Sequence, residues 1–485
     1  MCEERTVPVE QIPRGFVFSS CRDTSLALPR AHCRQSAWSS TLETVPLYND
    51  DVRRPGRELV CTFAGIVLLL VSACGRQPAR RPNIVIIVSD DLDYAKLGYN
   101  GYTRARTPHI DSLLESGVYF ANGYVSSPSC APSRAGLLTG RYQARYRYES
   151  QTGPISRMIE EDVGVNTSEI LLPELLRQAG YATGVIGKWH LGYNEKYRPN
   201  NRGVDYFFGY LAKRRYYWER ETASPILRND EEVEGEGYMP EVLAREAADF
   251  IQRSRDRPFF LYFAPPSVHM PYVVPDEYIP EGGLLIDGML QALDASVGTV
   301  LDALRRAGVE RDTLIVFMSD NGGSNDNTPY RGVKRTLYDG GIHVPFAMRW
   351  PERLPERTRY DPPVIQLDVL PTVVSVAGAT LPDDREYDGV DLVPFLTGET
   401  LGKPHESLFW RLTDMEGRLV GRAVRAEDLK LVLWPAGDGE GEHVELFDLV
   451  NDPSEELDLA ATRADDVEVL RRRLENWEQR VGVTP

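Results

Sequence analysis

One cysteine lies far along the chain from the other five, beside residues suited to binding an anion. Cys130 opens the segment Cys130-Ala131-Pro132-Ser133-Arg134. Because proline is tolerated in a helix's first turn, Pro132 predicts that Cys130 lies near a helix N-terminus, where N–H groups and the dipole favour an anion. Arg134, four residues on, can lie close to Cys130 across that turn. The pattern indicates either cysteine-based chemistry on an anionic substrate or a small buried hydrophobic residue.

Two further segments carry oxygen ligands at the ends of predicted strands. Asp90-Asp91 follows the apolar run Asn83–Ser89, and Asp320-Asn321 follows the strand predicted over Thr313–Met318. In open α/β sheets, ligands bind outside the carboxyl ends of strands, so these side chains can point into one crevice. Hard oxygen ligands suit Ca²⁺ or Mg²⁺ better than zinc. The alternative is that these residues belong to turns or helix N-caps.

The elements around these residues alternate between strands and helices. Continuous apolar, β-branched runs predict buried strands, and amphipathic periods predict helices. The predicted strands after Asn83–Ser89 are Ala182–Ile186, Phe259–Phe263 and Thr313–Met318, and the predicted helices are Pro108–Ser116, Glu169–Ala179, Pro240–Arg253 and Leu284–Ala307. This alternation predicts an α/β fold with a mostly parallel central sheet. The acidic stretch Asp230–Glu236 is expected to be a solvated loop.

Beyond about residue 380 the pattern changes to short alternating segments. Leu429–Trp434 and Val444–Leu449 are predicted strands, and a charged amphipathic helix is predicted near Asp465–Arg480. The expected domains are an upstream segment with a signal at 1–73, a linker at 74–81, a catalytic domain at 82–380 and a small α+β subdomain at 381–485.

Composition excludes one class of partner. The chain has 485 residues, 42% of them hydrophobic and 26% charged, with a formal net charge of −17. These values are ordinary for a soluble globular protein with one large and one smaller domain. An excess of acidic residues argues against nucleic-acid binding, which depends on excess lysine and arginine. A smaller anion is still accommodated where cations converge in one pocket.

The N-terminal region indicates export. Three arginines, Arg53, Arg54 and Arg57, precede a short apolar run that ends in Leu70-Val71-Ser72-Ala73-Cys74. This pattern predicts a lipoprotein-type signal, with a lipid on Cys74 holding the protein on a membrane that faces the periplasm or cell surface. The alternatives are a marginal membrane anchor or an N-terminal helix. Signals normally begin near the initiator, so residues 1–51 suggest that the start codon is set too far upstream.

Ordered motifs between residues 82 and 459 extend the pattern that begins at Cys130. They are Cys130–Arg134 with Leu138-Thr139-Gly140, Gly187-Lys188-Trp189-His190-Leu191-Gly192, Ser267-Val268-His269-Met270-Pro271, Ser319-Asp320-Asn321-Gly322-Gly323, Lys334 ahead of Tyr338-Asp339-Gly340-Gly341, and Glu445–Leu449. This series resembles the type I sulfatase family of the alkaline-phosphatase-like superfamily. The resemblance implies that family's sandwich fold and a cysteine oxidised by a formylglycine-generating enzyme.

The resemblance also implies a role for each matching residue. Asp90, Asp91, Asp320 and Asn321 would hold Ca²⁺ or Mg²⁺ together with an oxygen of the modified Cys130. Hydrated formylglycine is a geminal diol: one hydroxyl attacks sulfur and expels the alcohol, and the second loses its proton so that C–O cleavage releases sulfate. His190 would be the base for that release, Lys188 and Arg134 would hold the diol and the sulfate, and His269 and Lys334 would protonate the leaving oxygen.

Other readings differ in substrate or in class. A phosphonate monoester or phosphodiester hydrolase of the same superfamily is one, and a non-catalytic binder of sulfated glycans with an unconverted Cys130 is another. Within the sulfatase reading, the substrate is a sulfated saccharide or an aryl sulfate. Three positions depart from the family pattern, Asp93, Val268 and His343. The run Tyr216-Tyr217-Trp218 fits either a loop core or a sugar-stacking platform.

Overall fold

The computed structural model describes residues 81–212, 216–217, 224–436 and 441–483. All of them belong to one compact unit, Gln77–Pro485. The predicted signal and its lipid-bearing Cys74 lie outside the described residues, so export and lipid anchoring stay predictions. Among the described helices, none is both long enough and apolar enough to cross a membrane.

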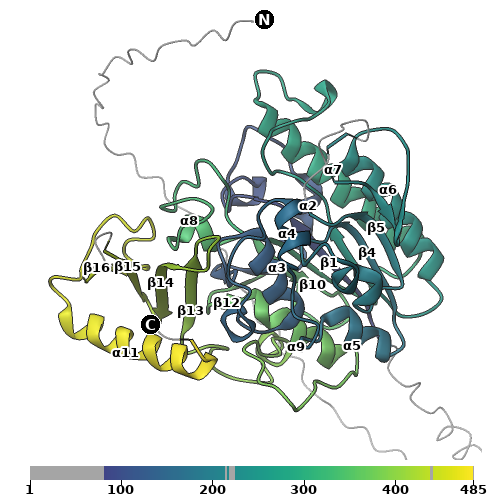
Figure 1. The fold of residues 1–485 in the computed structure, drawn as a ribbon. Coiled ribbons are helices and arrows are strands. Elements are labelled where there is room, and N and C mark those ends of the chain that lie inside the picture. Colours follow the sequence, from purple (N-terminus) through teal and green to yellow (C-terminus); the bar gives the residue numbers. More distant parts are fainter. Residues whose placement is uncertain (1–80, 213–215, 218–223, 437–440, 484–485) are drawn as a thin grey trace, which may run out of the picture. The chain divides into compact units, whose positions relative to one another are not determined.

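The larger sheet of the described region has ten strands, and its centre is parallel (Figure 1). From one edge to the other the strands are β11 (Thr358–Tyr360), β2 (Val118–Phe120), β10 (Phe346–Arg349), β9 (Thr313–Ser319), β1 (Asn83–Ser89), β8 (Phe259–Ala264), β4 (Ala182–Lys188), β5 (Tyr206–Tyr210), β6 (Leu227–Arg228) and β7 (Glu231–Glu232). Strands β9, β1, β8, β4 and β5 are parallel neighbours, whereas β10 and β6 run antiparallel to theirs. The predicted mostly parallel α/β sheet is confirmed.

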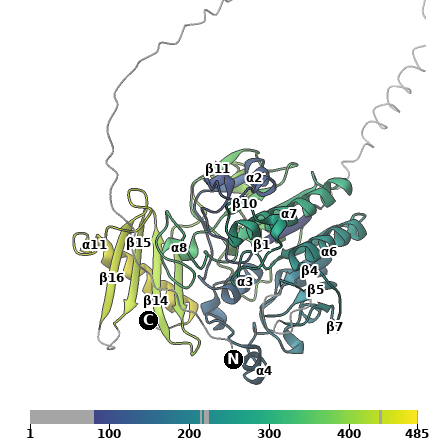
Figure 2. The same ribbon diagram turned by 90° about the horizontal axis from the view of Figure 1, so that it is seen from above.

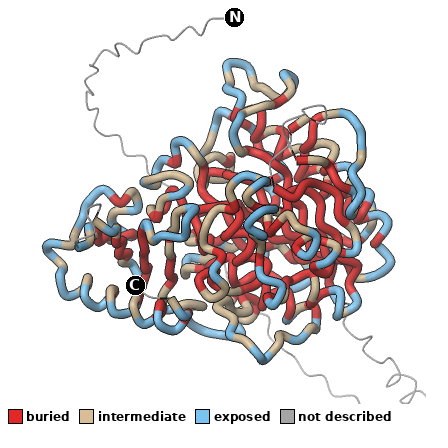
Figure 3. The backbone as a smooth tube through the Cα atoms, viewed as in Figure 1, coloured by how far each residue is buried: buried red, intermediate tan, exposed pale blue. Residues whose placement is uncertain are grey.

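Helices cover both faces of this sheet, which explains the unbroken apolar runs of its central strands. In β1, Ile84 and Ile86 pack into one core, whereas Val85 and Ile87 pack into the other. The first core includes residues of α3 (Cys130–Thr139), α5 (Leu172–Gln178) and α9 (Val369–Val376), and the second those of α2 (Pro108–Glu115), α6 (Met239–Ser254) and α7 (Leu285–Arg306). Figure 2 shows this layering from above, and Figure 3 shows the buried strands between the helices.

Shorter elements complete this part of the chain. They are α4 (Ile155–Glu160), α8 (Asp339–Ile342), α10 (Val393–Leu396) and a two-stranded sheet of β3 (Gly123–Tyr124) and β12 (Val364–Ile365).

Two predicted elements differ from the structure. Helix α5 begins at Leu172 rather than near Glu169, because Pro173 occupies its first turn and the Glu174 carboxylate accepts a hydrogen bond from the Leu171 N–H at 2.7 Å. A carboxylate at that position caps the helix and fixes its start. The acidic stretch is not entirely a loop, since exposed Glu231–Glu232 pairs with Leu227–Arg228 in a short hairpin at the sheet edge.

The C-terminal part forms a second, antiparallel sheet with one long helix. Its strands are β13 (Leu408–Thr413), β14 (Leu419–Ala426), β15 (Leu429–Pro435) and β16 (Glu442–Asp448), followed by α11 (Ala464–Val481). Helix α11 buries Leu470, Leu474 and Trp477. The predicted small α+β subdomain is confirmed, while its boundary at 380/381 stays a prediction.

A buried lysine of the second sheet, Lys430, links that sheet to α8. Lys430 of β15 lies 2.7 Å from Asp339 Oδ1 and 2.8 Å from Glu455 Oε1, and its side chain is fully buried. Asp339 belongs to α8, which follows the loop after β9. The ammonium group therefore compensates two carboxylates that the fold has removed from water.

Replacing Lys430 by methionine is expected to destabilise the protein by about 3–5 kcal/mol, because two buried carboxylates would lose their shared cation. Denaturant unfolding followed by circular dichroism measures the loss. The partly exposed Lys403, which pairs with the exposed Glu406 at 3.1 Å, provides a control whose replacement by methionine should cost less than about 1 kcal/mol. Equal midpoints for both variants would contradict this account.

Candidate active site

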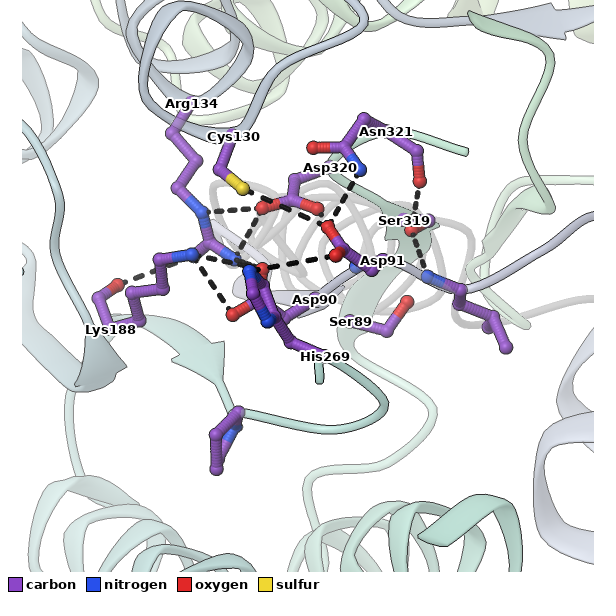
Figure 4. Close-up of polar contacts among 12 residues, drawn as sticks. Ser89, Asp90, Asp91, Cys130, Arg134, Lys188, His269, Ser319, Asp320 and Asn321 are labelled. Carbon is purple, nitrogen blue, oxygen red and sulfur yellow. Dashed lines mark hydrogen bonds and ion pairs between the residues drawn. The ribbon is translucent and has the colours of Figure 1, made fainter. Parts of the chain in front are cut away.

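Four neighbouring strands deliver the predicted site residues to one edge of the larger sheet. Strands β9, β1, β8 and β4 are adjacent and parallel, so their carboxyl ends lie together. Ser89 and Ser319 are paired in register, which places the acidic residues that follow them side by side. Lys188 ends β4, and His269 lies in the loop after β8. Figure 4 shows the side chains converging there.

The two carboxylates after β1 make different contacts. Asp90 is fully buried, and both of its oxygens accept hydrogen bonds from Lys188 Nζ at 2.9 Å. Burial opposes ionisation of Asp90, but Lys188, His269 and Arg134 together hold its pKa well below the usual range. The residue is therefore an anion at neutral pH.

Asp91 collects contacts from the loop that follows β9. Its Oδ1 accepts hydrogen bonds from Asn321 Nδ2 at 2.8 Å and from Lys334 Nζ, and its Oδ2 accepts one from Ser324 Oγ at 2.9 Å. Its backbone is left-handed, with φ of 63°, a conformation that costs a non-glycine residue about 1–3 kcal/mol. Such strain is typical of residues whose position is fixed by function.

Cys130 is the first residue of α3 and is almost fully buried. Its Sγ lies 2.8 Å from Lys334 Nζ and 3.8 Å from Asp91 Oδ1. Burial raises the pKa of the thiol, but the charges of Lys188 and Lys334 outweigh that effect and bring the pKa down to about 7. The side chain at this position therefore lies in a cationic environment suited to an anion.

Arg134 lies beneath the site and neutralises its acids. Its Nε and Nη2 contact Asp320 Oδ2 at 2.8 and 2.7 Å, and Nη2 lies 3.7 Å from Asp90 Oδ1. Nη1 donates to the hydroxyl of Tyr262 and the carbonyl of Lys188. The other oxygen of Asp320 accepts the N–H of Asp91 at 3.2 Å. The guanidinium thus ties three strand ends together.

The two histidines lie in opposite electrostatic settings. His269 Nε2 is 3.5 Å from Asp91 Oδ2, and although burial opposes protonation, Asp90 and Asp91 raise the pKa of this imidazole. Burial and the nearby charges of Lys188 and Arg134 instead lower the pKa of His190. A raised pKa at His269 and a lowered pKa at His190 are the directions that suit a general acid and a general base.

Local contacts position each ring. His190 has a left-handed backbone, with φ of 65°, and its Nε2 lies 3.2 Å from the Thr152 hydroxyl. His269 Nδ1 lies 2.6 Å from the Met270 carbonyl, and the buried Tyr216 hydroxyl donates to the His269 and Pro266 carbonyls. Tyr216 therefore supports the loop of His269, while the Tyr217 ring packs against Tyr238. Trp218 lies outside the described residues.

A hollow of about 400 Å³, here called the inner hollow, reaches Lys188 and both histidines. Its lining residues are Gln151, Thr152, Gly153, Pro154, Lys188, His190, Ala212, His269, Arg335 and Met415. The other site residues are absent from that lining: Asp90, Asp91, Cys130, Arg134, Asp320, Asn321 and Lys334. The predicted contact of Arg134 with substrate oxygens stays a prediction, and the contacts above assign it to positioning the acids.

The donor set fits a hard divalent cation. Oxygens of Asp90 and Asp91, with the Cys130 sulfur and a His269 nitrogen, lie within 4.8 Å of one another. In addition, Asn321 Oδ1 is buried and accepts no hydrogen bond from the described residues. A buried amide oxygen without a donor is costly unless a cation satisfies it. Asp320 contacts Arg134 and the Asp91 N–H instead, so its place among the ligands stays a prediction.

The structure adds residues that the motifs did not indicate, chiefly Thr152, Tyr262 and Ser324. Ser324 directly follows the Ser319–Gly323 motif, so its position near Asp91 was accessible from the sequence. Thr152 has no motif around it. Asp93, one of the three departures, packs against Gly323, where any side chain would clash with its carboxylate. His343 stacks near Tyr124 and lies 3.3 Å from Asp339, outside the inner hollow.

The fold and the site together define a hydrolase of anionic esters, and comparison with known proteins narrows the class. The sulfatase family model matches residues 82–379, and the N-sulphoglucosamine sulphohydrolase C-terminal model matches residues 332–480. N-acetylgalactosamine-6-sulfatase of Mus musculus is 32% identical in an alignment 379 residues long that covers 71% of this chain and 72% of that protein. An uncharacterized sulfatase of Escherichia coli (strain K12), YdeN, is 31% identical in an alignment 425 residues long that covers 74% of this chain and 73% of that one.

A solved structure agrees with these matches. The crystal structure of Ps i-CgsB in complex with k-i-k-neocarrahexaose has a TM-score of 0.75 at 31% identity, covering 84% of this chain and 95% of that chain. The chain belongs to the sulfatase family, within the alkaline-phosphatase-like superfamily, and is a sulfuric ester hydrolase.

Proposed function

We propose that this sulfatase releases sulfate from sulfated saccharides by means of a formylglycine formed from Cys130. The observation that carries the proposal is the position of Cys130. Cys130 is the first residue of α3, and its Sγ lies 2.8 Å from Lys334 Nζ and beside the carboxylates at the sheet edge. Hydrated formylglycine would supply two hydroxyl groups on one carbon, which a thiol does not offer.

The side chains around that position divide the remaining tasks. Asp90, Asp91, Asp320 and Asn321 would hold a divalent cation, Ca²⁺ or Mg²⁺. Such an ion would supply charge compensation for the sulfate group and fix its orientation. Lys188 adds a positive charge at the floor of the inner hollow. These cations offset the acidic character of the whole chain at the one place where an anion must bind.

Proton transfer falls to the two histidines and one lysine. His269, whose pKa is raised, donates a proton to the departing alcohol oxygen together with Lys334. His190, whose pKa is lowered, accepts the proton whose removal allows sulfate to leave. Both imidazoles line the inner hollow, so each faces the space where substrate must lie.

The names of the relatives support a saccharide as the alcohol. N-acetylgalactosamine-6-sulfatase and the complex of Ps i-CgsB with k-i-k-neocarrahexaose both concern sugars. The inner hollow, at about 400 Å³, has room for a sulfated sugar ring. A membrane-anchored, exported enzyme, as the N-terminal pattern predicts, would meet such glycans outside the cytoplasm.

Measuring sulfate release over a panel of defined sulfated saccharides tests this function. The protein is produced together with a formylglycine-generating enzyme, and an aryl sulfate, an aryl phosphodiester and a phosphonate monoester are included. We expect sulfate esters to be hydrolysed with higher kcat/KM than both phosphorus esters. Faster turnover of a phosphorus ester would favour the related hydrolase, and binding of sulfated sugars without sulfate release would favour a non-catalytic binder.

Removing the divalent cation is expected to lower activity at least about tenfold, because the sulfate would lose its main charge partner. It should also lower the melting temperature by about 3–5 °C, since a ligand at a hundred times its Kd stabilises by about 2.7 kcal/mol. Treatment with a chelator, followed by titration with Ca²⁺ or Mg²⁺, measures both effects.

A variant pair makes this result specific to the site. Asn321→Ala should raise the cation concentration needed for half-maximal recovery, whereas Asn325→Ala should not. Asn325 belongs to the same loop but donates to the Tyr272 hydroxyl instead of Asp91. Full activity after exhaustive chelation would contradict the proposed cation.

A further inference from the structure

A second hollow, here called the outer hollow, adjoins the inner one, and a single arginine, Arg335, borders both. This outer hollow measures about 380 Å³. It is lined by Ser129, Gln151, Arg335, Leu412, Thr413, Asp414, Met415, Glu416, Arg418 and Val420. Gln151, Arg335 and Met415 line both hollows. A ligand that occupied both hollows would therefore pass Arg335 on its way to the β13–β14 turn.

The backbone of Arg335 is held by a hydrogen bond, although its side chain is exposed. It follows Lys334, and its N–H donates to the Pro128 carbonyl at 2.9 Å. Pro128 lies just before Cys130, so the backbone of Arg335 is tied to the start of α3. Consequently the distance between this arginine and the reacting group is set by the fold rather than by a free loop.

The four charged residues of the outer hollow, Arg335, Arg418, Asp414 and Glu416, sum to zero, but both carboxylates pair with Arg418 and not with Arg335. Arg418 lies 2.6 Å from Asp414 and 3.2 Å from Glu416, so its guanidinium already faces two carboxylates. Among the described residues, the Arg335 side chain has no carboxylate or carbonyl within hydrogen-bonding or ion-pair distance. It is thus a cation available to a ligand, directly beside the reacting groups.

The rest of the lining of the outer hollow includes hydrogen-bonded and apolar residues. The Thr413 hydroxyl lies 2.9 Å from that of Ser150, and Arg157 Nη2 donates to the Met415 carbonyl at 2.7 Å. Exposed side chains of Met415 and Val420 face the same space. A surface with apolar contacts, one amide and one unpaired cation suits a sugar ring that carries an anion.

We infer that Arg335 binds a second anionic group of the saccharide, a carboxylate or a further sulfate, while the reacting groups hold the scissile sulfate. The inference rests on the proposed function. A planar guanidinium offers paired N–H donors that match two oxygens of a carboxylate or sulfate. The preferred substrates would then be saccharides with at least two negative charges, the second one on the outward side of the scissile ester.

The test compares three disaccharides that share one scissile sulfate ester. One carries no other charge, one carries a uronate carboxylate and one carries a second sulfate. For the converted full-length protein, the measured quantity is kcat/KM on each doubly charged substrate divided by kcat/KM on the singly charged one. Arg335→Gln is expected to lower this ratio about tenfold to a hundredfold, the usual worth of a hydrogen-bonded charge. Arg335→Lys should lower it less, because the charge remains.

A matched control is available at Arg357. This exposed arginine also has a left-handed backbone, with φ of 53° against 68° for Arg335, and it borders neither hollow. Arg357→Gln removes the same charge and should leave the ratio within twofold of the parent value. Melting temperatures of all variants show whether each is folded.

The possible outcomes distinguish the role of Arg335 from the proposed sulfate-ester hydrolysis on which it rests. A fall in the ratio with both doubly charged substrates assigns a general anion site, and a fall with one alone identifies its anion as carboxylate or sulfate. An unchanged ratio in Arg335→Gln, with sulfate esters still hydrolysed, would overturn the role of Arg335 alone. If the converted parent protein hydrolyses none of the sulfate esters, the proposed function fails, and the inference fails with it.

Discussion

Cys130→Ala is expected to lower sulfate-ester hydrolysis by a factor on the order of 10⁴ or more, the scale on which enzymes lose activity when their nucleophile is removed. Cys130 is the first residue of α3, and its buried side chain lies between Lys334 and Asp91. It is the side chain there that can be oxidised to an aldehyde. A sulfated thiol has no second hydroxyl with which to expel sulfate and would have to wait for water. Alanine offers no nucleophile at all, so the variant should fail at the first step, whereas unconverted cysteine would fail at the release of sulfate.

Mass spectrometry of the peptide that contains Cys130 gives the converted fraction independently of activity. Activity should scale with that fraction when the generating enzyme is supplied at different levels. Cys130→Ser should be inactive unless a system that converts serine is present, and its melting temperature should stay close to that of the parent. Undiminished hydrolysis by Cys130→Ala would refute the mechanism, whatever the fold.

The second largest effect is expected for His269→Ala, a loss of about 10²–10⁴-fold in kcat. The pKa of the His269 imidazole is raised, as suits a general acid, and the ring lines the inner hollow, where the departing oxygen must lie. A good leaving group needs little protonation, so the loss should be large for a sugar sulfate and small for a nitrophenyl sulfate. Comparing kcat for these two substrates measures the acid role separately from binding.

His443→Ala is the matched control for that experiment. His443 belongs to β16, and 67% of its side-chain surface is exposed, so its removal should change neither substrate's kcat by more than about twofold. If His269→Ala lowers kcat equally for both substrates, His269 acts in binding or positioning rather than in protonating the leaving oxygen.

Much of the fold follows from the sequence because the central strands are buried on both faces. Asn83–Ser89 is a continuous apolar run, and the structure has β1 at those same residues. Polar residues directly after such runs lie at the carboxyl edge of the sheet, which predicts Asp90 and Asp320 at the same edge. That the two are neighbours depends on the pairing of β1 with β9. Pro132 likewise indicates the start of the helix that holds Cys130.

Features that depend on distant segments were not accessible in this way. The outer hollow joins Gln151, Arg335 and Met415, which are far apart in the chain and belong to no shared motif. Neither periodicity nor spacing specifies how the second sheet packs on the first. The support that Tyr216 gives to His269 is also a contact between segments, and its sequence neighbours pointed equally to a sugar platform.

The turn between β13 and β14 gives the reaction space a boundary that the chemistry itself does not use. Every group assigned to proton transfer or cation binding comes from the larger sheet and its loops, whereas Thr413–Arg418 comes from the second sheet. Insertions or replacements in this turn can therefore change which sugars enter without moving the reacting atoms. Substrate specificity and catalytic rate then depend on separate segments of the chain. Replacing this turn by the corresponding turn of a relative should therefore change which glycans are hydrolysed while the reacting groups stay the same.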